Sequence, residues 1–358
     1  MDLEKTFRFT SVSRPVVPHE HTPPSNLLGP LGVLRGTWKG RGFNQIWRPF
    51  FVDPTAPPTV PPTPAGQDRF LELNETLETL TFEEIPGDVP NRGFLQSDIN
   101  LHGLRYLQQV QDANALGPNG ELAGIHVEHG MWLTVPTTTV PVDPTTVVRL
   151  ATIPHGVSLA AQGAALPPHV GPPTFDPVSI APFGIPPAVN TPLPPNNTIT
   201  PTVFPERDLT IPTNFRTAAS DIPNVTQDMV DNPNAFLSLG LQGKNVISTV
   251  TLAISTVSPN PAPNVPPPPP PANPQANPPV PGGQPTTGGG IANIAFLAGN
   301  PAPNALAARM DAVFWIETLE EPDGKIRHQL QYSQFVLLNF NGLSWPHVSV
   351  ATLVKQEG

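Results

Sequence analysis

The stretch that decides the fold is residues 326–355, which read IRHQLQYSQFVLLNFNGLSWPHVSVATLVK. In its first half, alternate residues share one face of a very long predicted strand: Ile326, His328, Leu330, Tyr332, Gln334, Val336, Leu338 and Phe340. Asn341-Gly342 then turns the chain, and residues 345–355 form a second strand. Antiparallel neighbours joined by a short turn at the chain end are typical of an up-and-down β-barrel, which closes by pairing its last strand with its first.

Further strands are predicted upstream, with a turn signal roughly every ten residues. They cover residues 104–110, 124–135, 147–153, 157–163, 245–256 and 312–319. Residues 70–82, FLELNETLETLTF, read as a long strand whose apolar residues change parity near Leu80, which predicts a bend or bulge. A helix is the alternative for this segment, and its threonines disfavour it. The whole pattern predicts an all-β protein, an antiparallel up-and-down β-barrel with long Pro-rich loop insertions.

Proline content sets the domain organisation. The chain has 358 residues, of which 53 are Pro and 28 are Gly, and 13% are charged. Residues 1–26 read as an irregular N-terminal arm, and residues 27–358 as a single barrel domain with Pro-rich insertions at about 164–230 and 258–290. The second insertion has almost no large apolar side chain, and Pro cannot donate to a central strand ladder. We therefore expect it to be a spacer outside the barrel core.

Composition also excludes several classes of function. The chain has no Cys, so disulfides, cysteine nucleophiles and iron–sulfur clusters are ruled out. A net charge of −10 with only 18 Lys and Arg argues against a nucleic-acid partner. No apolar run is long enough for a membrane span, and the charged start, Met-Asp-Leu-Glu-Lys, is unlike a secretory signal. The expected location is the cytoplasm.

Three segments resemble the nitrobindin family of calycin barrels. They are LGVLRGTWKG at 31–40, VEHGMWL at 127–133 and WPHVSVATLVK at 345–355, and they occur in the family's order. The resemblance spans about 1–163 and 240–358; the Pro-rich insertions and Leu133 depart from the family pattern. It implies a fatty-acid-binding-protein-like barrel that binds haem b, and it carries the family's proximal haem ligand over to His347.

The residues around His347 are compatible with such a role. His347 follows a Pro and shares its strand face with Ser349, Ala351 and Leu353, whose first two side chains are small and leave room inside a barrel. Imidazole is a frequent protein ligand of haem iron. The alternative is a rim histidine that hydrogen-bonds a loop.

Three other histidines are candidates for acid–base catalysis. His126 and Glu128 share one strand face and His129 lies on the other, so one of the two histidines points inward. His155 lies in an Ile-Pro-His-Gly turn at a barrel mouth. A haem-free metal site of His126, His129, His155 and Glu128 remains an alternative, although on a strand the two histidines of His-x-Glu-His face apart.

The remaining candidates are contacts of the bound molecule: Trp38, Met131, Arg149 and Tyr332. Haem propionates would lie at the mouth near Arg48 or Arg149. The predicted partner is a small apolar or diatomic ligand, such as nitric oxide, peroxynitrite or peroxide, and an enzyme would be a haem-dependent peroxidase or isomerase. Two alternatives stay open: a haem-free barrel for a lipid or terpenoid, and a structural protein that assembles, as a homo-oligomer for example, through its Pro-rich loops.

Overall fold

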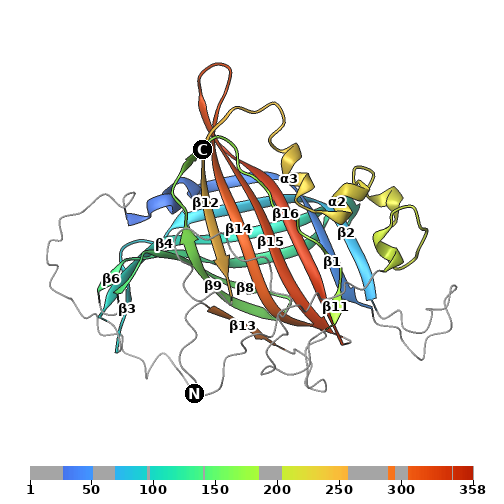
Figure 1. The fold of residues 1–358 in the computed structure, drawn as a ribbon, viewed down its shortest axis with the longest axis horizontal. Coiled ribbons are helices and arrows are strands. Elements are labelled where there is room, and N and C mark those ends of the chain that lie inside the picture. The colour runs from blue at the N-terminus through green and yellow to red at the C-terminus, as the bar shows by residue number, and fades with distance from the viewer. Residues whose placement is uncertain are drawn as a thin grey trace, which may run out of the picture.

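Ten strands of the protein, described here from a computed structural model, form a closed antiparallel barrel (Figure 1). The structure describes residues 27–50, 69–94, 97–139, 142–184, 204–256, 289–294, 305–340 and 342–357. The order around the barrel is β12–β14–β15–β16–β1–β2–β4–β5–β8–β9, and β9 pairs with β12 to complete the circle. The bounds are β1 Gly36–Pro49, β2 Arg69–Glu84, β4 Ile99–Leu116, β5 Leu122–Val135, β8 Thr146–Ile153, β9 Val157–Ala165, β12 Val246–Ser255, β14 Leu306–Glu320, β15 Ile326–Phe340 and β16 Leu343–Lys355.

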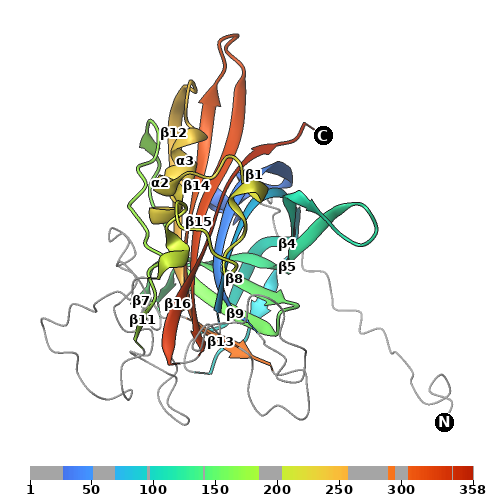
Figure 2. The same cartoon turned by 90° about the vertical axis from the view of Figure 1, so that its right-hand side faces the viewer.

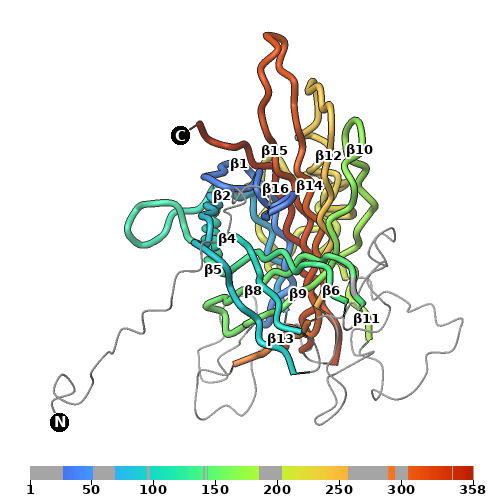
Figure 3. The backbone as a smooth tube through the Cα atoms, turned by 90° about the vertical axis from the view of Figure 1, so that its left-hand side faces the viewer, coloured from blue at the N-terminus to red at the C-terminus, as the bar shows by residue number. Residues whose placement is uncertain are grey.

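The remaining elements are short. They are the strands β3 Val89–Asn91, β6 Thr138–Thr139, β7 Val142–Asp143, β10 His169–Val170, β11 Phe183–Gly184 and β13 Gly289–Asn293, the 3-10 helices η2 Gly29–Leu34, η3 Pro205–Arg207 and η4 Ala219–Asp221, and the helices α2 Gln227–Asp231 and α3 Ala235–Leu239. In the part of the chain that the structure describes, no helix has the length and apolar character needed to cross a membrane. The hairpins β4–β5 and β14–β15 extend beyond the barrel wall (Figure 3).

Closure occurs where the sequence predicts it, because the last strand, β16, pairs with the first, β1. The register runs from Trp38 opposite Lys355 to Ile46 opposite His347. Gly40 makes this seam tight: a Cβ at Gly40 would lie 2.0 Å from the carbonyl oxygen of Thr352. Gly40 therefore allows the strands to approach more closely than any larger residue would permit.

One end of the barrel is plugged. Leu31 and Leu34 of η2 are buried in the same core cluster as Trp38, Trp132 and Phe314. The Trp38 Nε1–H donates to the carbonyl oxygen of Leu34 at 2.7 Å, so the indole nitrogen is satisfied as well as buried. This packing positions η2 across the barrel end and leaves any internal space at the opposite end.

A second core lies outside the barrel. The described residues of 171–240 cover the outer face of β1, β2 and β14–β16, and α2 and α3 lie there in Figures 1 and 2. The Trp47 Nε1–H donates to the carbonyl oxygen of Ile180 at 2.9 Å, and Leu71 and Leu73 are fully buried beneath this layer. The described part of the 164–230 insertion therefore packs as structure.

This outer layer corrects the expectation for residues 70–82. β2 is a strand, and its pairing with β1 continues from Phe82 to Arg69 without a register shift, so the predicted bulge is wrong. The apolar residues change parity because Leu71 and Leu73 face the outer layer, whereas Leu80 and Phe82 face the barrel interior. A strand buried on both faces shows no single alternation.

The N-terminal arm 1–26 and most of the second Pro-rich insertion lie outside the described residues. The exceptions in 258–290 are Gly289 and Gly290, which begin β13 and pair with β9. Those two glycines therefore belong to the sheet and not to the spacer that the sequence predicts.

Candidate functional site

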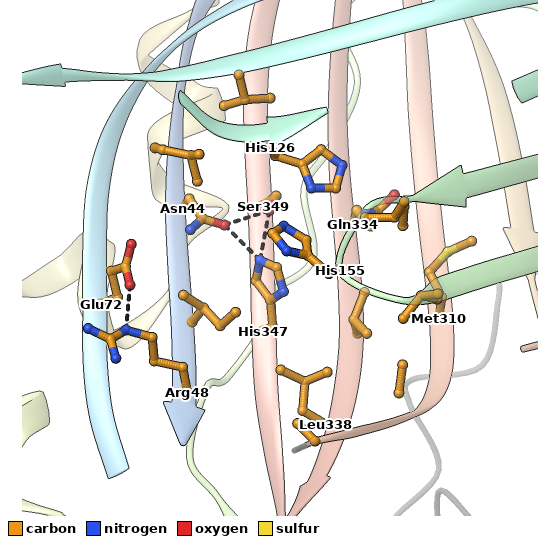
Figure 4. A pocket seen from close by; sticks show the side chains of 18 of the residues that line it. Asn44, Arg48, Glu72, His126, His155, Met310, Gln334, Leu338, His347 and Ser349 are labelled. Carbon is orange, nitrogen blue, oxygen red and sulfur yellow. Dashed lines mark hydrogen bonds and ion pairs between the residues drawn. The ribbon is translucent and has the colours of Figure 1, made fainter. Parts of the chain in front are cut away.

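The open half of the barrel contains a cavity of about 560 Å³. Its walls come from β1, β2, β14, β15 and β16 on one side and from β4, β5, β8, β9 and β13 on the other, with the turn between β8 and β9 beside His347 (Figure 4). Aliphatic side chains such as Ile46, Val110, Met310 and Val336 supply much of the lining. A cavity of this volume, whose aliphatic lining is interrupted by polar side chains, suits a small organic ligand.

His347 projects into this cavity from β16. Its Nε2 lies 2.7 Å from Oδ1 of Asn44, and the Ser349 hydroxyl donates to the same oxygen at 2.7 Å. Nδ1 has no hydrogen-bond partner among the described residues. Burial, together with the charges of His126 and His155, lowers the pKa of His347 to about 3. The imidazole is therefore neutral at physiological pH and can act as an electron-pair donor.

His126 and His155 lie together beside His347 (Figure 4), with their ring centroids 5.6 Å apart. Their position follows from the sheet, because β5 pairs with β8 only from His129 to Val135 and leaves a seam open below. The two imidazoles lie at that seam, and the His155 ring also hydrogen-bonds the backbone of Ile125. Burial, reinforced by the charge of His126, lowers the pKa of His155.

A layer of polar side chains forms the floor between the cavity and the plug. Glu128 binds Arg149 and the Tyr106 hydroxyl, and its Oε2 lies 3.4 Å from Nε2 of His126. Burial opposes the charge on Glu128, but Arg149 together with His126 and the Tyr106 hydrogen bond outweighs it, so the pKa of this carboxyl is lowered to about 2. Arg149 also donates to Gln334 at 2.6 Å. Arg149 is therefore occupied by partners inside the barrel floor.

Glu78 occupies the other side of this floor. The Tyr332 hydroxyl donates to its Oε2 at 2.7 Å, and the Gln108 amide donates to its Oε1 at 2.8 Å. Burial raises the pKa of Glu78 to about 7, against the effect of these two hydrogen bonds. Glu78 and Glu128 are thus two buried carboxyls with opposite pKa shifts, an arrangement frequent at functional sites.

The mouth of the cavity carries one ion pair. Arg48 Nε lies 2.7 Å from Oε2 of Glu72, and its guanidinium stacks 4.6 Å from the ring centre of Phe70. The Arg48 side chain is 41% exposed, so it remains accessible to an anionic group of a ligand at the entrance.

The structure brings together four of the residues that the sequence singles out. His126, His155, Tyr332 and His347 all line the cavity. Arg149 lies in the floor. Trp38 is fully buried in the plug, while His129 and Met131 lie on the exposed outer face of β5, so none of these three contacts the cavity.

The positions of these histidines also concern the alternative of a metal site without haem, formed by His126, His129, His155 and Glu128. His129 faces away from His126, and the described residues contain no group of three or more His or carboxylate side chains that could hold a metal ion.

Sequence reasoning missed the amides around the site. Asn44, Gln108 and Gln334 line the cavity or hold its histidine, yet none belongs to a motif. One feature of the sequence could have indicated them. Asn74, Thr76 and Glu78 lie on the same strand face as Leu80 and Phe82, so these polar side chains point into the barrel. Polar residues on a core-facing strand require buried partners.

Comparisons with known proteins do not assign the chain to a family. No family model matches the chain, and no curated protein matches it. One similar solved structure is described as "Crystal Structure of Rv2717c from M. tuberculosis"; it is 14% identical, with a TM-score of 0.34, and the match covers 92% of this chain and 99% of that chain. A similarity at this level carries no argument about ligand or activity, and the barrel assignment rests on the strand pairing itself.

Proposed function

We propose that the barrel binds haem b in the cavity, where His347 would hold the iron. The observation that carries this proposal is a neutral imidazole, with a free ring nitrogen, on the wall of a cavity of about 560 Å³. The resemblance of residues 345–355 to the closing strand of nitrobindins supports the same assignment. The donor set fits, because haem needs one protein nitrogen and not a cluster.

The other residues of the cavity suit the remaining parts of such a ligand. Aliphatic side chains cover an apolar macrocycle, and Arg48 at the mouth is the accessible cation for its carboxylates. Arg149 does not serve that purpose, since Glu128 already neutralises it in the floor. Bound haem would supply an iron centre able to take nitric oxide, peroxide or peroxynitrite. His126 and His155 lie where they can hold or move a proton beside it.

A second candidate function is a barrel that holds an apolar molecule without iron. The observation in its favour is that Nε2 of His347, the nitrogen farthest from the backbone, is already hydrogen-bonded to Asn44. The lining of Ile46, Val110, Val336 and Leu338 suits a lipid or terpenoid equally well. The third alternative, assembly through Pro-rich loops, concerns the 164–230 insertion, whose described part packs on the barrel, and residues 258–288, which lie outside the described residues.

Hemin titration followed by absorption spectroscopy separates these functions. Wild type and the His129→Ala control, which changes an exposed histidine on the outer face, are expected to give the same Soret shift and affinity. His347→Ala is expected to lose the shifted band and bind at least about tenfold more weakly. Equal spectra and affinities for wild type and His347→Ala would eliminate His347 as the ligand.

No Soret shift in wild type would overturn the haem proposal altogether. The apolar-ligand barrel would then take its place. Native mass spectrometry of the purified protein would test that function by detecting a co-purified lipid.

A further inference from the structure

Four adjacent strands carry a continuous chain of hydrogen bonds that ends on His347. Asn44 on β1 lies 2.7 Å from His347 Nε2, and its Nδ2 donates to Oδ1 of Asn74 on β2 at 3.3 Å. Asn74 Nδ2 in turn donates to Oδ2 of Asp112 on β4 at 2.8 Å. Asn44 and Asn74 face each other directly in the β1–β2 register and are both buried.

The carboxylate of Asp112 determines which end of each amide donates in this series of hydrogen bonds. Its Oδ1 accepts the backbone N–H groups of Asn114 and Ala115 at 2.8 and 3.0 Å, which leaves Oδ2 to accept from Asn74. A carboxylate only accepts, so Asn74 must turn its NH₂ toward Asp112 and its oxygen toward Asn44. Asn44 then offers its NH₂ to Asn74 and its oxygen to the imidazole.

The orientation of Asn44 decides where the proton of His347 resides. An amide oxygen can only accept, so the proton must be on Nε2. The Ser349 Oγ also lies 3.2 Å from Nε2, but its hydroxyl donates to the Asn44 oxygen at 2.7 Å and therefore has no proton left to donate to Nε2. We infer that Asn44, Asn74 and Asp112 are positioning residues that hold His347 as the Nε2–H tautomer and present the lone pair of Nδ1 to the cavity.

This inference narrows the class of ligand. A lone pair at Nδ1 matches an electron-pair acceptor such as a haem iron, or a hydrogen-bond donor such as the hydroxyl or N–H of an apolar molecule. A carboxylate or ketone oxygen is itself a hydrogen-bond acceptor, so it cannot bond to the lone pair of Nδ1. Such a ligand would lose the hydrogen bond that its oxygen makes in water. The inference about the ligand class rests on the proposed function, in which His347 contacts the ligand. The inference about the tautomer does not depend on that function.

Asp112→Asn tests the relay with an almost isosteric change. The backbone donors of Asn114 and Ala115 would hold the new amide oxygen in the Oδ1 position, so its NH₂ would face Asn74. Asn74 and then Asn44 would have to turn over, and Asn44 would offer its NH₂ to Nε2 of His347. We expect His347 to switch to the Nδ1–H tautomer.

The measurement is long-range ¹⁵N–¹H correlation spectroscopy of the ligand-free, ¹⁵N-labelled full chain. His347 is assigned as the signal lost in His347→Ala. Wild type and Glu121→Gln, which removes an exposed carboxylate from the same hairpin, are expected to show Nε2–H, and Asp112→Asn to show Nδ1–H. A wild-type Nδ1–H tautomer, or an unchanged tautomer in Asp112→Asn, overturns the inference, and the wild-type result stands even if the variant fails to fold.

Hemin titration of the same proteins separates this inference from the proposed function. If both hold, Asp112→Asn binds hemin about 10- to 100-fold more weakly than wild type and Glu121→Gln, as is typical when an outer partner of a ligand histidine is changed. A wild-type protein with the Nε2–H tautomer and no Soret shift would refute haem binding and leave the relay standing. Equal hemin affinity in Asp112→Asn, with the tautomer switched, would refute Nδ1 as the contact atom.

Discussion

The two halves of the barrel interior use the same ten strands for opposite purposes. In the plugged half, Trp38, Trp132 and Phe314 fill the space under η2 with large side chains in contact. In the hollow half, the inward positions of β16 carry His347 and Ser349, and the space above them stays open. The bulky apolar residues are thus concentrated at one end, where they stabilise the fold, and the other end retains an open cavity.

The polar floor separates the two halves. Glu128, Arg149 and Tyr106 hydrogen-bond one another on one side, and Glu78, Gln108 and Tyr332 do so on the other. Buried polar groups of this kind contribute to a single arrangement only when their hydrogen bonds are made. The floor therefore sets the depth to which a ligand can enter.

The largest expected effect comes from the plug. Trp38→Ala removes a fully buried indole and its hydrogen bond to Leu34, so we expect a loss of about 3–5 kcal/mol in the free energy of unfolding. Val336→Ala in the hollow half is the matched control and should cost about 1 kcal/mol, since its side chain faces open space. Urea denaturation measures both. Equal losses at the two positions would contradict the division of the barrel into a stabilising and a hollow half.

The second-largest expected loss of stability comes from a change in the polar floor. Glu128→Gln leaves the buried guanidinium of Arg149 without its counter-charge, which is expected to cost at least about 3 kcal/mol in denaturation experiments. The double change Glu128→Gln with Arg149→Met should recover much of that loss. Glu72→Gln, which breaks the exposed pair at the mouth, should cost less than about 1 kcal/mol. A loss as small as this for Glu128→Gln would show that the floor does not hold the ion pair.

A smaller effect depends on pH. The folded protein keeps a proton on Glu78 up to about pH 7, whereas the unfolded chain releases it near 4.5, so the folded state binds more protons between these values. The free energy of unfolding therefore falls as pH rises through this interval, by up to about 3 kcal/mol from this one group.

Glu78→Gln should abolish that contribution, and the variant should be more stable than wild type at pH 8 but not at pH 4. Denaturation curves across this range provide the measurement, with the exposed Glu83→Gln as the control for the loss of one carboxylate. If the stability difference between Glu78→Gln and wild type does not change with pH, Glu78 does not cause the pH dependence.

The sequence predicted the closure of the barrel because the necessary information is local. The alternation in 326–340, the Asn-Gly turn and the final strand all follow from short-range patterns. The pairing of β15 with β16 and of β16 with β1 confirms the two strands and the closure, while Asn341 lies outside the described residues. The outer layer could not be predicted in this way. Leu71 and Leu73 are covered by residues more than a hundred positions away, so their burial depends on long-range contacts that no strand period reveals.

Of the cavity lining, the sequence singled out the three histidines, Tyr332 and Arg48. His347, His126 and His155 attract attention by their chemistry, and the strand parity correctly separated His126 from His129. Asn44 and Asn74 have no such signature, because an amide gains its role from the partner across the sheet. The same holds for Glu78, whose pKa is raised by burial that only the closed barrel creates.

The most direct test of the hollow half as the ligand site is to fill it. Val336→Trp places an indole in the cavity, and Val127→Trp places the same side chain on the exposed outer face of β5 as a control. In hemin titrations, we predict that Val127→Trp binds like wild type and that Val336→Trp loses at least about tenfold in affinity without losing its fold. Wild-type affinity and spectrum in a folded Val336→Trp would contradict the central claim that the ligand occupies this cavity.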